Sequence, residues 1–294
     1  MIIVCLKGGL GNQMFQYAAA RRLASLHKVS LKLDLSWFGD DLSGVTPRSY
    51  ALDPFFIHAE PATYQEIARL YEPQAGRIRR LLNSINPRYR KTHIRGQNFH
   101  FDPDILQLPD NIILDGYWQS EKYFSNIDSV IRSDFTVRAE PEGRNREVAA
   151  VINESNAVSI HLRRGDYVSD AKNVARYWVC SNDYYMRAIK LVTEQVERPH
   201  FFVFSDDPDW VREHFIMPHP MTLVDHNGPD QAHEELRLMS HCSHHIIANS
   251  SFSWWGAWLN PRPDKIVIAP LRWFNDPTID TSDLMPATWL RINP

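Results

Sequence analysis

The chain has 294 residues, enough for one large domain or two domains of about 150 residues each. Its net charge of −3 argues against a general nucleic-acid binder, which needs a basic face to neutralise phosphates. Three cysteines without C-x-x-C spacing predict neither a disulfide framework nor a thiolate zinc site, which fits a reducing compartment. The opening apolar stretch is about six residues long, too short for a signal peptide or a membrane span. We therefore expect a cytoplasmic protein with at most peripheral membrane association.

The chain opens with a predicted strand, a glycine turn and a helix, "MIIVCLKGGLGNQMFQYAAA". A dinucleotide-binding fingerprint requires G-x-G-x-x-G, but Met14 stands where the third glycine after Gly9 and Gly11 should be. The G-K-[ST] sequence of a phosphate-binding loop is also absent, so the turn predicts neither NAD nor ATP binding. Two interpretations stay open: Asn12 caps the helix, or Asn12 and Gln13 approach a ligand at its N-terminus.

Short apolar runs separated by helix-like segments make up most of the remaining chain. The segments Asn182–Arg198 and Asp230–Ser240 are typical of helices, and such alternation predicts a parallel sheet covered on both faces. A polar run with Pro and Gly at Glu140–Asn145 predicts a boundary between two domains, 1–145 and 146–294. The expected strands lie in "MIIVCL", "NIILDGYW", "AVSIHL", "HFFVFSDD", "HHIIANSS" and "DKIVIAP". The basic residues between positions 69 and 95 favour a solvated face over a partner site; they are Arg69, Arg77, Arg79, Arg80, Arg88, Arg90, Lys91 and Arg95.

The segment "SIHLRRGDY" carries polar side chains at the end of an apolar strand. Alternation places Ser159, His161 and Arg163 on one face, with Ile160 and Leu162 on the other. Open α/β sheets bind ligands at this end of a parallel strand, and arginine suits a diphosphate because its planar fork donates two parallel hydrogen bonds. We expect a ligand site rather than an arginine–aspartate pair that only holds a turn. Asp166 is placed to orient one guanidinium.

The segment "FSDDPDW" ends another predicted strand with two carboxylates. Asp207 followed by Pro208 is typical of a helix N-cap and first helical residue. The Asp207-x-Asp209 spacing also matches the D-x-D of metal-dependent glycosyltransferases, but Asp102-x-Asp104 has the same spacing by chance. The pair alone therefore does not predict a metal site.

In "HHIIANSSFSWWGAWLN", small polar residues precede an apolar helix. Hydroxyls and free backbone N–H groups at a helix N-terminus form an anion site, here at Asn249, Ser250 and Ser251. The tryptophans of this segment are expected in the core. The nearby histidines lack the H-E-x-x-H spacing because Arg237 replaces the second histidine, so we expect no metal here.

Taken in order, "GGLGNQMFQYA", "GYWQSEKYF", "HLRRGDY", "FSDD" and "NSSFSWWGAWL" resemble the bacterial α-1,2-fucosyltransferases, glycosyltransferase family 11. The resemblance extends from Gly8 to Leu259. It implies an α/β fold of GT-B type, with two Rossmann-like domains facing a cleft. It also implies inverting, metal-independent transfer of fucose from GDP-β-L-fucose to the 2-OH of a terminal galactose, without a cofactor. The N-terminal domain would hold the acceptor and the C-terminal domain GDP-fucose.

The resemblance also implies roles for individual residues. Arg163 would grip the diphosphate and Asn12 would reach the donor across the cleft, and these two are the expected catalytic residues. Tyr117, Trp118 and Glu121 are the expected acceptor contacts. The remaining donor contacts are expected at His161, Arg164, Asp166, Asp206, Glu235, Asn249, Ser250, Ser251 and Phe252.

The sequence does not identify a general base for the galactose hydroxyl. Asp34, Asp115 and Glu121 are all candidates. Two alternatives to the fucosyltransferase remain: a non-catalytic carbohydrate-binding protein, suggested by nine Trp and eleven Tyr, and a GDP-sugar transferase that forms another linkage.

Overall fold

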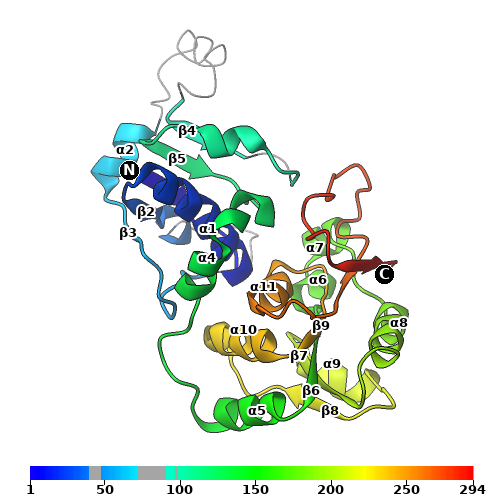
Figure 1. The fold of residues 1–294 in the computed structure, drawn as a ribbon. Helices are drawn as coiled ribbons and strands as arrows, with labels where there is room; N and C mark the ends of the chain where they lie inside the picture. Colours follow the sequence, from blue (N-terminus) through cyan, green and yellow to red (C-terminus); the bar gives the residue numbers. More distant parts are fainter. Residues whose placement is uncertain (40–47, 72–90, 97–98, 294) are drawn as a thin grey trace. The chain divides into compact units, whose positions relative to one another are not determined.

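The computed structural model describes residues 1–39, 48–71, 91–96 and 99–293, which divide into two compact units (Figure 1). The first unit comprises Met1–Thr136 and Asp280–Leu284, and the second comprises Val137–Ile279 and Met285–Pro294. The chain therefore enters the second unit ahead of the polar run at 140–145. Of the predicted basic face, Arg77, Arg79, Arg80, Arg88 and Arg90 lie outside the described residues.

The first unit contains a parallel sheet with the strand order β3-β2-β1-β5-β4. Helix α2 covers one face, where Leu70 packs on Ile3 and Ile113, and α1 packs against β1 and β2. The strands are β1 (Ile2–Cys5), β2 (Leu31–Asp34), β3 (Glu60–Pro61), β4 (His93–Arg95) and β5 (Ile112–Asp115). The helices are α1 (Leu10–His27), α2 (Tyr64–Leu70) and α4 (Asp128–Asp134), with short 3₁₀ turns η1 (Ser36–Gly39), η3 (Pro103–Gln107), η4 (Glu121–Tyr123) and η5 (Ser125–Ile127).

The second unit contains a longer parallel sheet with the order β11-β10-β9-β6-β7-β8. Its strands are β6 (Asn156–Leu162), β7 (Pro199–Ser205), β8 (Met221–Val224), β9 (His244–Ile246), β10 (Val267–Pro270) and β11 (Leu290–Ile292). Its helices are α5 (Gly143–Asn153), α6 (Gly165–Ser169), α7 (Ala171–Arg176), α8 (Asn182–Thr193), α9 (Pro208–His214), α10 (Ala232–His241) and α11 (Ser251–Leu259), with the 3₁₀ turn η6 (Pro229–Gln231).

Helices cover both faces of the second sheet, and β6 shows how alternation distributes its side chains. Val158, Ile160 and Leu162 pack with α8 and α9 in one apolar cluster. Ala157 faces the opposite cluster, which includes side chains of α5 and α10. The predicted alternation of this strand is therefore confirmed, and it leaves His161 on the α5 and α10 side.

Several local predictions are confirmed. All six predicted apolar runs contain strands. Asp207 caps α9 by accepting a hydrogen bond from the Trp210 backbone N–H at 3.3 Å, with Pro208 as the first helical residue. Trp254 and Trp255 are fully buried. Within the described residues, none of the helices combines the length and apolar character needed to cross a membrane.

Candidate active site

The strand order of the second sheet identifies where a ligand would bind. From β6 the chain proceeds to β7 and β8 on one side, whereas β9, β10 and β11 lie on the other side. Parallel sheets bind ligands outside the carboxyl ends of the two strands at which the order reverses. Here those strands are β6 and β9, which lead into the loops at Arg163 and Asn249.

Arg163 follows β6 and is held by a carboxylate from the neighbouring strand. Its Nη1 lies 2.9 Å from Oδ2 of Asp206, which follows β7. The other oxygen, Oδ1, accepts a hydrogen bond from the Arg164 backbone N–H at 2.8 Å. The guanidinium also lies 5.2 Å from the ring centroid of Tyr167. Asp206 thus orients the guanidinium and fixes the turn that carries it.

Arg164 points to a different neighbourhood. Its guanidinium stacks 3.7 Å from the centroid of the Trp210 ring, and its Nε lies 3.5 Å from Oδ2 of Asp207. Trp210 and Asp207 belong to α9 and its cap. Arg164 also lines a small pocket of about 170 Å³ together with Tyr185. Arg163 and Arg164 thus have different ion-pair partners, although both line this pocket.

His161 is a buried polar side chain at the same strand end. It is 4% exposed, and its ring centroid lies 5.7 Å from that of Phe252 at the start of α11. Burial, followed by the positive charge of Arg163, lowers the pKa of His161 to about 3, so the imidazole is neutral at physiological pH. In the described structure its Nδ1 is buried and makes no hydrogen bond.

Glu235 lies on α10 and is a neutral carboxyl at pH 7. Burial raises its pKa to about 8, and the nearby charge of Asp206 adds to the rise. Glu235 and Asp206 therefore belong to one neighbourhood, in which Asp206 pairs with Arg163 and Glu235 retains its proton.

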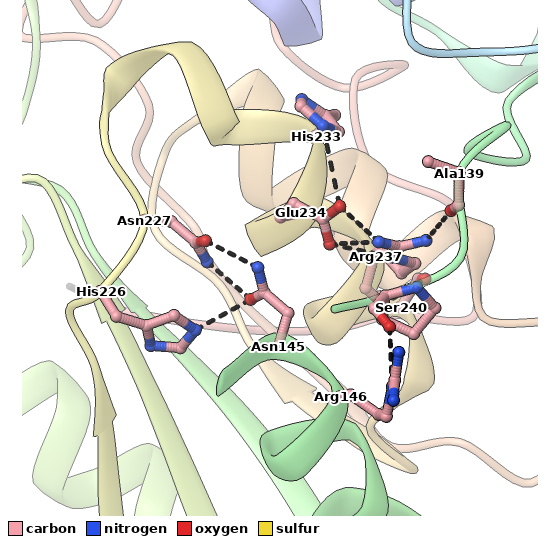
Figure 2. Close-up of polar contacts among 10 residues, drawn as sticks. Ala139, Asn145, Arg146, His226, Asn227, His233, Glu234, Arg237 and Ser240 are labelled. Carbon is pink, nitrogen blue, oxygen red and sulfur yellow. Dashed lines mark hydrogen bonds and ion pairs between the residues drawn. The ribbon is translucent and has the colours of Figure 1, made fainter. Parts of the chain in front are cut away.

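A polar network fixes the start of α10 (Figure 2). Asn145 on α5 exchanges hydrogen bonds of 2.9 and 3.0 Å with Asn227, which follows β8. On α10 itself, Arg237 pairs with Glu234 and donates to the Ala139 carbonyl. The Arg237 contacts thus tie α10 to the segment at Ala139, and the asparagine pair ties α5 to the loop that leads into α10.

The loop after β9 supplies a second group of candidate site residues. Ser250 caps α11, and its hydroxyl accepts a hydrogen bond from the Phe252 backbone N–H at 3.3 Å. The first turn, which contains Ser251, directs the positive end of the helix dipole out of its N-terminus, a preferred position for phosphate. Asn249 is fully buried, and its Nδ2 donates to the carbonyls of Trp178 at 2.6 Å and Trp273 at 2.9 Å. Its side chain therefore holds the loop in place.

The remaining predicted residues lie elsewhere. The backbone of Asp166 lies in α6, but its side chain is outside the described residues. Asn12 lies inside α1, whose N-cap is Gly9 and has no side-chain cap, so the capping interpretation of Asn12 is wrong. Its Oδ1 instead accepts a hydrogen bond from Gln119 Nε2 at 2.7 Å. Gly8 has φ +78°, and a Cβ there would lie 2.7 Å from Asn12 Nδ2, so only glycine fits this turn.

The expected acceptor residues follow β5 in the first unit. Tyr117 is half-buried. Trp118 is 4% exposed, and its ring fills the space where side chains on Gly96 and Gly116 would lie. Glu121 begins η4. Of these residues, Tyr117 therefore presents the accessible aromatic ring, and the roles of all three stay predictions.

Two glutamines organise the opening turn: Gln13, which the sequence suggested as a ligand contact, and Gln16, which it did not single out. Gln13 is fully buried; its Nε2 donates to the carbonyls of Gly8 and Ser49, both at 2.9 Å, and its Oε1 accepts from the Ala51 N–H at 2.9 Å. Gln16 binds both backbone groups of Lys7. Polar residues at i and i+3 in an otherwise apolar helix were the available signal. Among the described residues, no group of three or more His, Cys, Asp or Glu side chains is arranged to hold a metal ion.

Comparison with known proteins identifies the family of this chain. The profile of glycosyl transferase family 11 matches residues 81–293. An Escherichia coli alpha-1,2-colitosyltransferase is 33% identical over 301 residues, which cover 99% of both chains. Galactoside alpha-(1,2)-fucosyltransferase 2 of Rattus norvegicus is 26% identical over 86% of this chain and 65% of its own.

A solved structure shares the fold. NodZ from Bradyrhizobium, an alpha-1,6-fucosyltransferase whose crystal was soaked with GDP-fucose, aligns with a TM-score of 0.51 and 17% identity. The alignment covers 91% of this chain and 94% of NodZ. Together with the two parallel sheets, this likeness confirms the predicted α/β fold of GT-B type.

Proposed function

The chain belongs to glycosyl transferase family 11, and we propose that it is a galactoside α-1,2-L-fucosyltransferase. The donor would be GDP-β-L-fucose, and the acceptor hydroxyl the 2-OH of a terminal galactose. The observation that supports this most directly is the pair of Arg163 and the α11 N-terminus at the point where the second sheet reverses its order. Family membership makes the chain a glycosyltransferase, which disfavours the non-catalytic carbohydrate-binding alternative.

The proposed chemistry follows from the leaving group. Breaking the bond from fucose to GDP develops negative charge on the β-phosphate and positive charge on the sugar. Arg163 and the N–H groups of the α11 first turn would stabilise that phosphate most strongly in the transition state. Because Asp206 already orients Arg163, little reorganisation is needed when the bond breaks. We propose that these groups serve in place of a metal ion or cofactor.

Three further donor contacts are proposed around this centre. The neutral His161 and the protonated Glu235 can each exchange hydrogen bonds with the nucleotide. Asn12 on α1 is proposed to contact the donor sugar. Attack by the galactose 2-OH on the face opposite GDP would invert the anomeric configuration in one displacement. We place the reaction in the cytoplasm because the three cysteines have no disulfide pattern.

A second donor deserves a test because the colitosyltransferase matches this chain over its whole length. Colitose is a dideoxyhexose that lacks one hydroxyl of fucose. Transfer of either sugar would use the same diphosphate grip, so Arg163 and α11 do not discriminate between them.

The experiment is direct. The full chain is incubated with GDP-fucose and lactose in the presence of EDTA, and the product is analysed by NMR. We expect release of GDP and fucose linked α-1,2 to the galactose of lactose, at a rate that EDTA does not change. A parallel reaction with GDP-colitose measures the donor preference. Absence of product and of GDP release across several galactosides would refute the proposal.

A further inference from the structure

The first sheet has its own point of reversal, at the carboxyl ends of β1 and β5. From β1 the strand order continues to β2 and β3 on one side and to β5 and β4 on the other. Lys7 follows β1, and Asp115 is the last residue of β5. Parallel sheets bind ligands at the point where their strand order reverses. In the second sheet, the proposed donor site lies at that point.

Lys7 and Asp115 form a half-buried ion pair at this position. Lys7 Nζ lies 2.7 Å from Asp115 Oδ1, and the two side chains are 24% and 20% exposed. The other carboxylate oxygen, Oδ2, lies 3.2 Å from Nε2 of His93 at the start of β4. Lys7 Nζ also lies 5.3 Å from the centroid of the Tyr117 ring. A cation, a carboxylate and an aromatic ring thus meet in one partly open place.

The chain holds Lys7 in place through its backbone. The fully buried Gln16 accepts a hydrogen bond from the Lys7 N–H at 3.0 Å, and its Nε2 donates to the Lys7 carbonyl at 3.3 Å. The Asp115 carboxylate is fixed by His93, whose ring lies 4.5 Å from that of Tyr71. Both members of the pair are therefore preorganised, as binding groups must be.

We propose that Lys7 and Asp115 bind two neighbouring hydroxyls of the acceptor galactose, with the Tyr117 ring against an apolar face of the sugar. This inference rests on the proposed function and adds two acceptor-binding residues to it. An ammonium has three N–H donors, of which Asp115 takes one, and a carboxylate has about four acceptor positions. The pair therefore presents a donor beside an acceptor, which matches adjacent hydroxyls that each donate and accept. Asp115 lies 2.7 Å from Lys7 and 3.7 Å from Nε of the exposed Arg95, so it offsets part of their positive charge, and the adjacent donor and acceptor suit the hydroxyls of a neutral sugar.

The same contacts define what Asp115 does. Hydrogen bonds from His93 and then from Lys7 hold the pKa of Asp115 well below its usual range. A carboxylate of such low proton affinity accepts hydrogen bonds at any assay pH but removes a proton poorly. Asp115 is therefore suited to accept hydrogen bonds from sugar hydroxyls and is a weak candidate for the general base.

The test uses Lys7→Met and Asp115→Asn in the full chain. Lys32→Met is the matched control, because Lys32 lies on β2 of the same sheet and forms a 2.5 Å pair with Glu66 of α2, at similar exposure. The measured quantities are the KM for lactose at saturating GDP-fucose, the Kd for GDP, the hydrolysis of GDP-fucose without acceptor, and the melting temperature. We expect the KM for lactose to rise about 10- to 100-fold in both variants, the loss typical of a hydrogen bond to a charged group. GDP binding and donor hydrolysis should stay unchanged, as should all parameters of Lys32→Met.

An unchanged KM for lactose, or an equal loss of GDP binding, would overturn the inference. If Lys7→Met fails to fold, Lys7→Arg and Tyr117→Ala provide the same comparison with smaller changes. Failure of the proposed function itself would show first in the wild-type protein, as absence of transfer to lactose. Saturation-transfer NMR with methyl β-D-galactoside then tests the inference alone: binding to wild type that Asp115→Asn loses supports it, and equal binding or none refutes it.

Discussion

The Asp206 carboxylate joins two parts of one turn: Oδ2 lies 2.9 Å from Arg163 Nη1, and Oδ1 accepts from the backbone N–H of the next residue at 2.8 Å. Arg163 is therefore held by a neighbouring strand as well as by its own loop. The pairing of β6 with β7 explains this contact. Leu162 lies opposite Ser205 at the strand ends, and Arg163 and Asp206 are the residues that directly follow them. The arginine that the proposed reaction needs is thus positioned before any donor binds.

Replacing Arg163 by alanine should weaken GDP binding about 10- to 100-fold and reduce transfer further, because the proposed site places its charged fork on the phosphate. Arg163→Lys should restore only part of the loss, since an ammonium cannot donate two parallel hydrogen bonds. Calorimetric titration with GDP and initial rates measure both effects. Arg262→Ala, at an exposed pair with Asp264, is the control. Near-normal activity of Arg163→Ala would remove this residue from the mechanism.

Gly165→Ala should damage the site without touching a ligand. A methyl group on residue 165 would overlap the Asp206 carboxylate, so Asp206 must move and Arg163 with it. A displacement of about 1 Å costs roughly 100-fold in rate, and we expect such a loss in kcat/KM. Gly228→Ala is the control, since nothing lies within 4 Å of its added methyl. Equal activity of the two variants would show that Asp206 does not position Arg163.

The raised pKa of Glu235 predicts that the stability of the fold depends on pH. Its folded-state pKa of about 8 lies above its ordinary value of 4.5, mainly because of burial. The stabilisation from its bound proton is therefore complete below pH 4.5 and is lost as the pH rises through about 8. Glu235→Gln, which stays neutral, should raise the melting temperature relative to wild type at pH 8.5 and have little effect at pH 5. The same difference at both pH values would contradict this assignment.

Gln13→Leu should destabilise the first unit. The substitution removes three hydrogen bonds to partly buried backbone groups, each worth about 0.5–1.5 kcal/mol. We expect a loss of about 3 kcal/mol in the free energy of unfolding, measured by urea denaturation. Gln65→Leu, at an exposed position on α2, should leave stability within about 0.5 kcal/mol of wild type. A small effect of Gln13→Leu would mean that water replaces its bonds.

Local periodicity predicted much of the fold. The apolar runs around Ile3, Ile113, Ile160, Val203 and Ile268 contain strands because their side chains suit buried parallel sheets. Shorter or more polar strands escaped detection. Examples are β4 at His93–Arg95 and β8 at Met221–Val224, which gain their stability from pairing with a neighbour rather than from their own composition.

The candidate site was only partly predictable for the same reason. The motif at Arg163 signals a ligand because it follows an apolar strand, but nothing local shows that Asp206 of the neighbouring strand pairs with its guanidinium. That partnership depends on which strand lies beside β6. Likewise, Lys7 has no motif of its own, because its partner Asp115 is 108 positions away in the chain.

The sequence by itself determined the α/β class, the strand ends that carry polar side chains, and the family resemblance, because these depend on local order and composition. Only the tertiary structure decided the strand order of each sheet, and with it the position at which that order reverses. Strand order brings Arg163 to Asp206 and Lys7 to Asp115, since hydrogen-bonded strands lie about 4.8 Å apart whatever their separation in sequence. The tertiary structure also showed that Gly8, with φ +78°, lies against Asn12 at the opening turn.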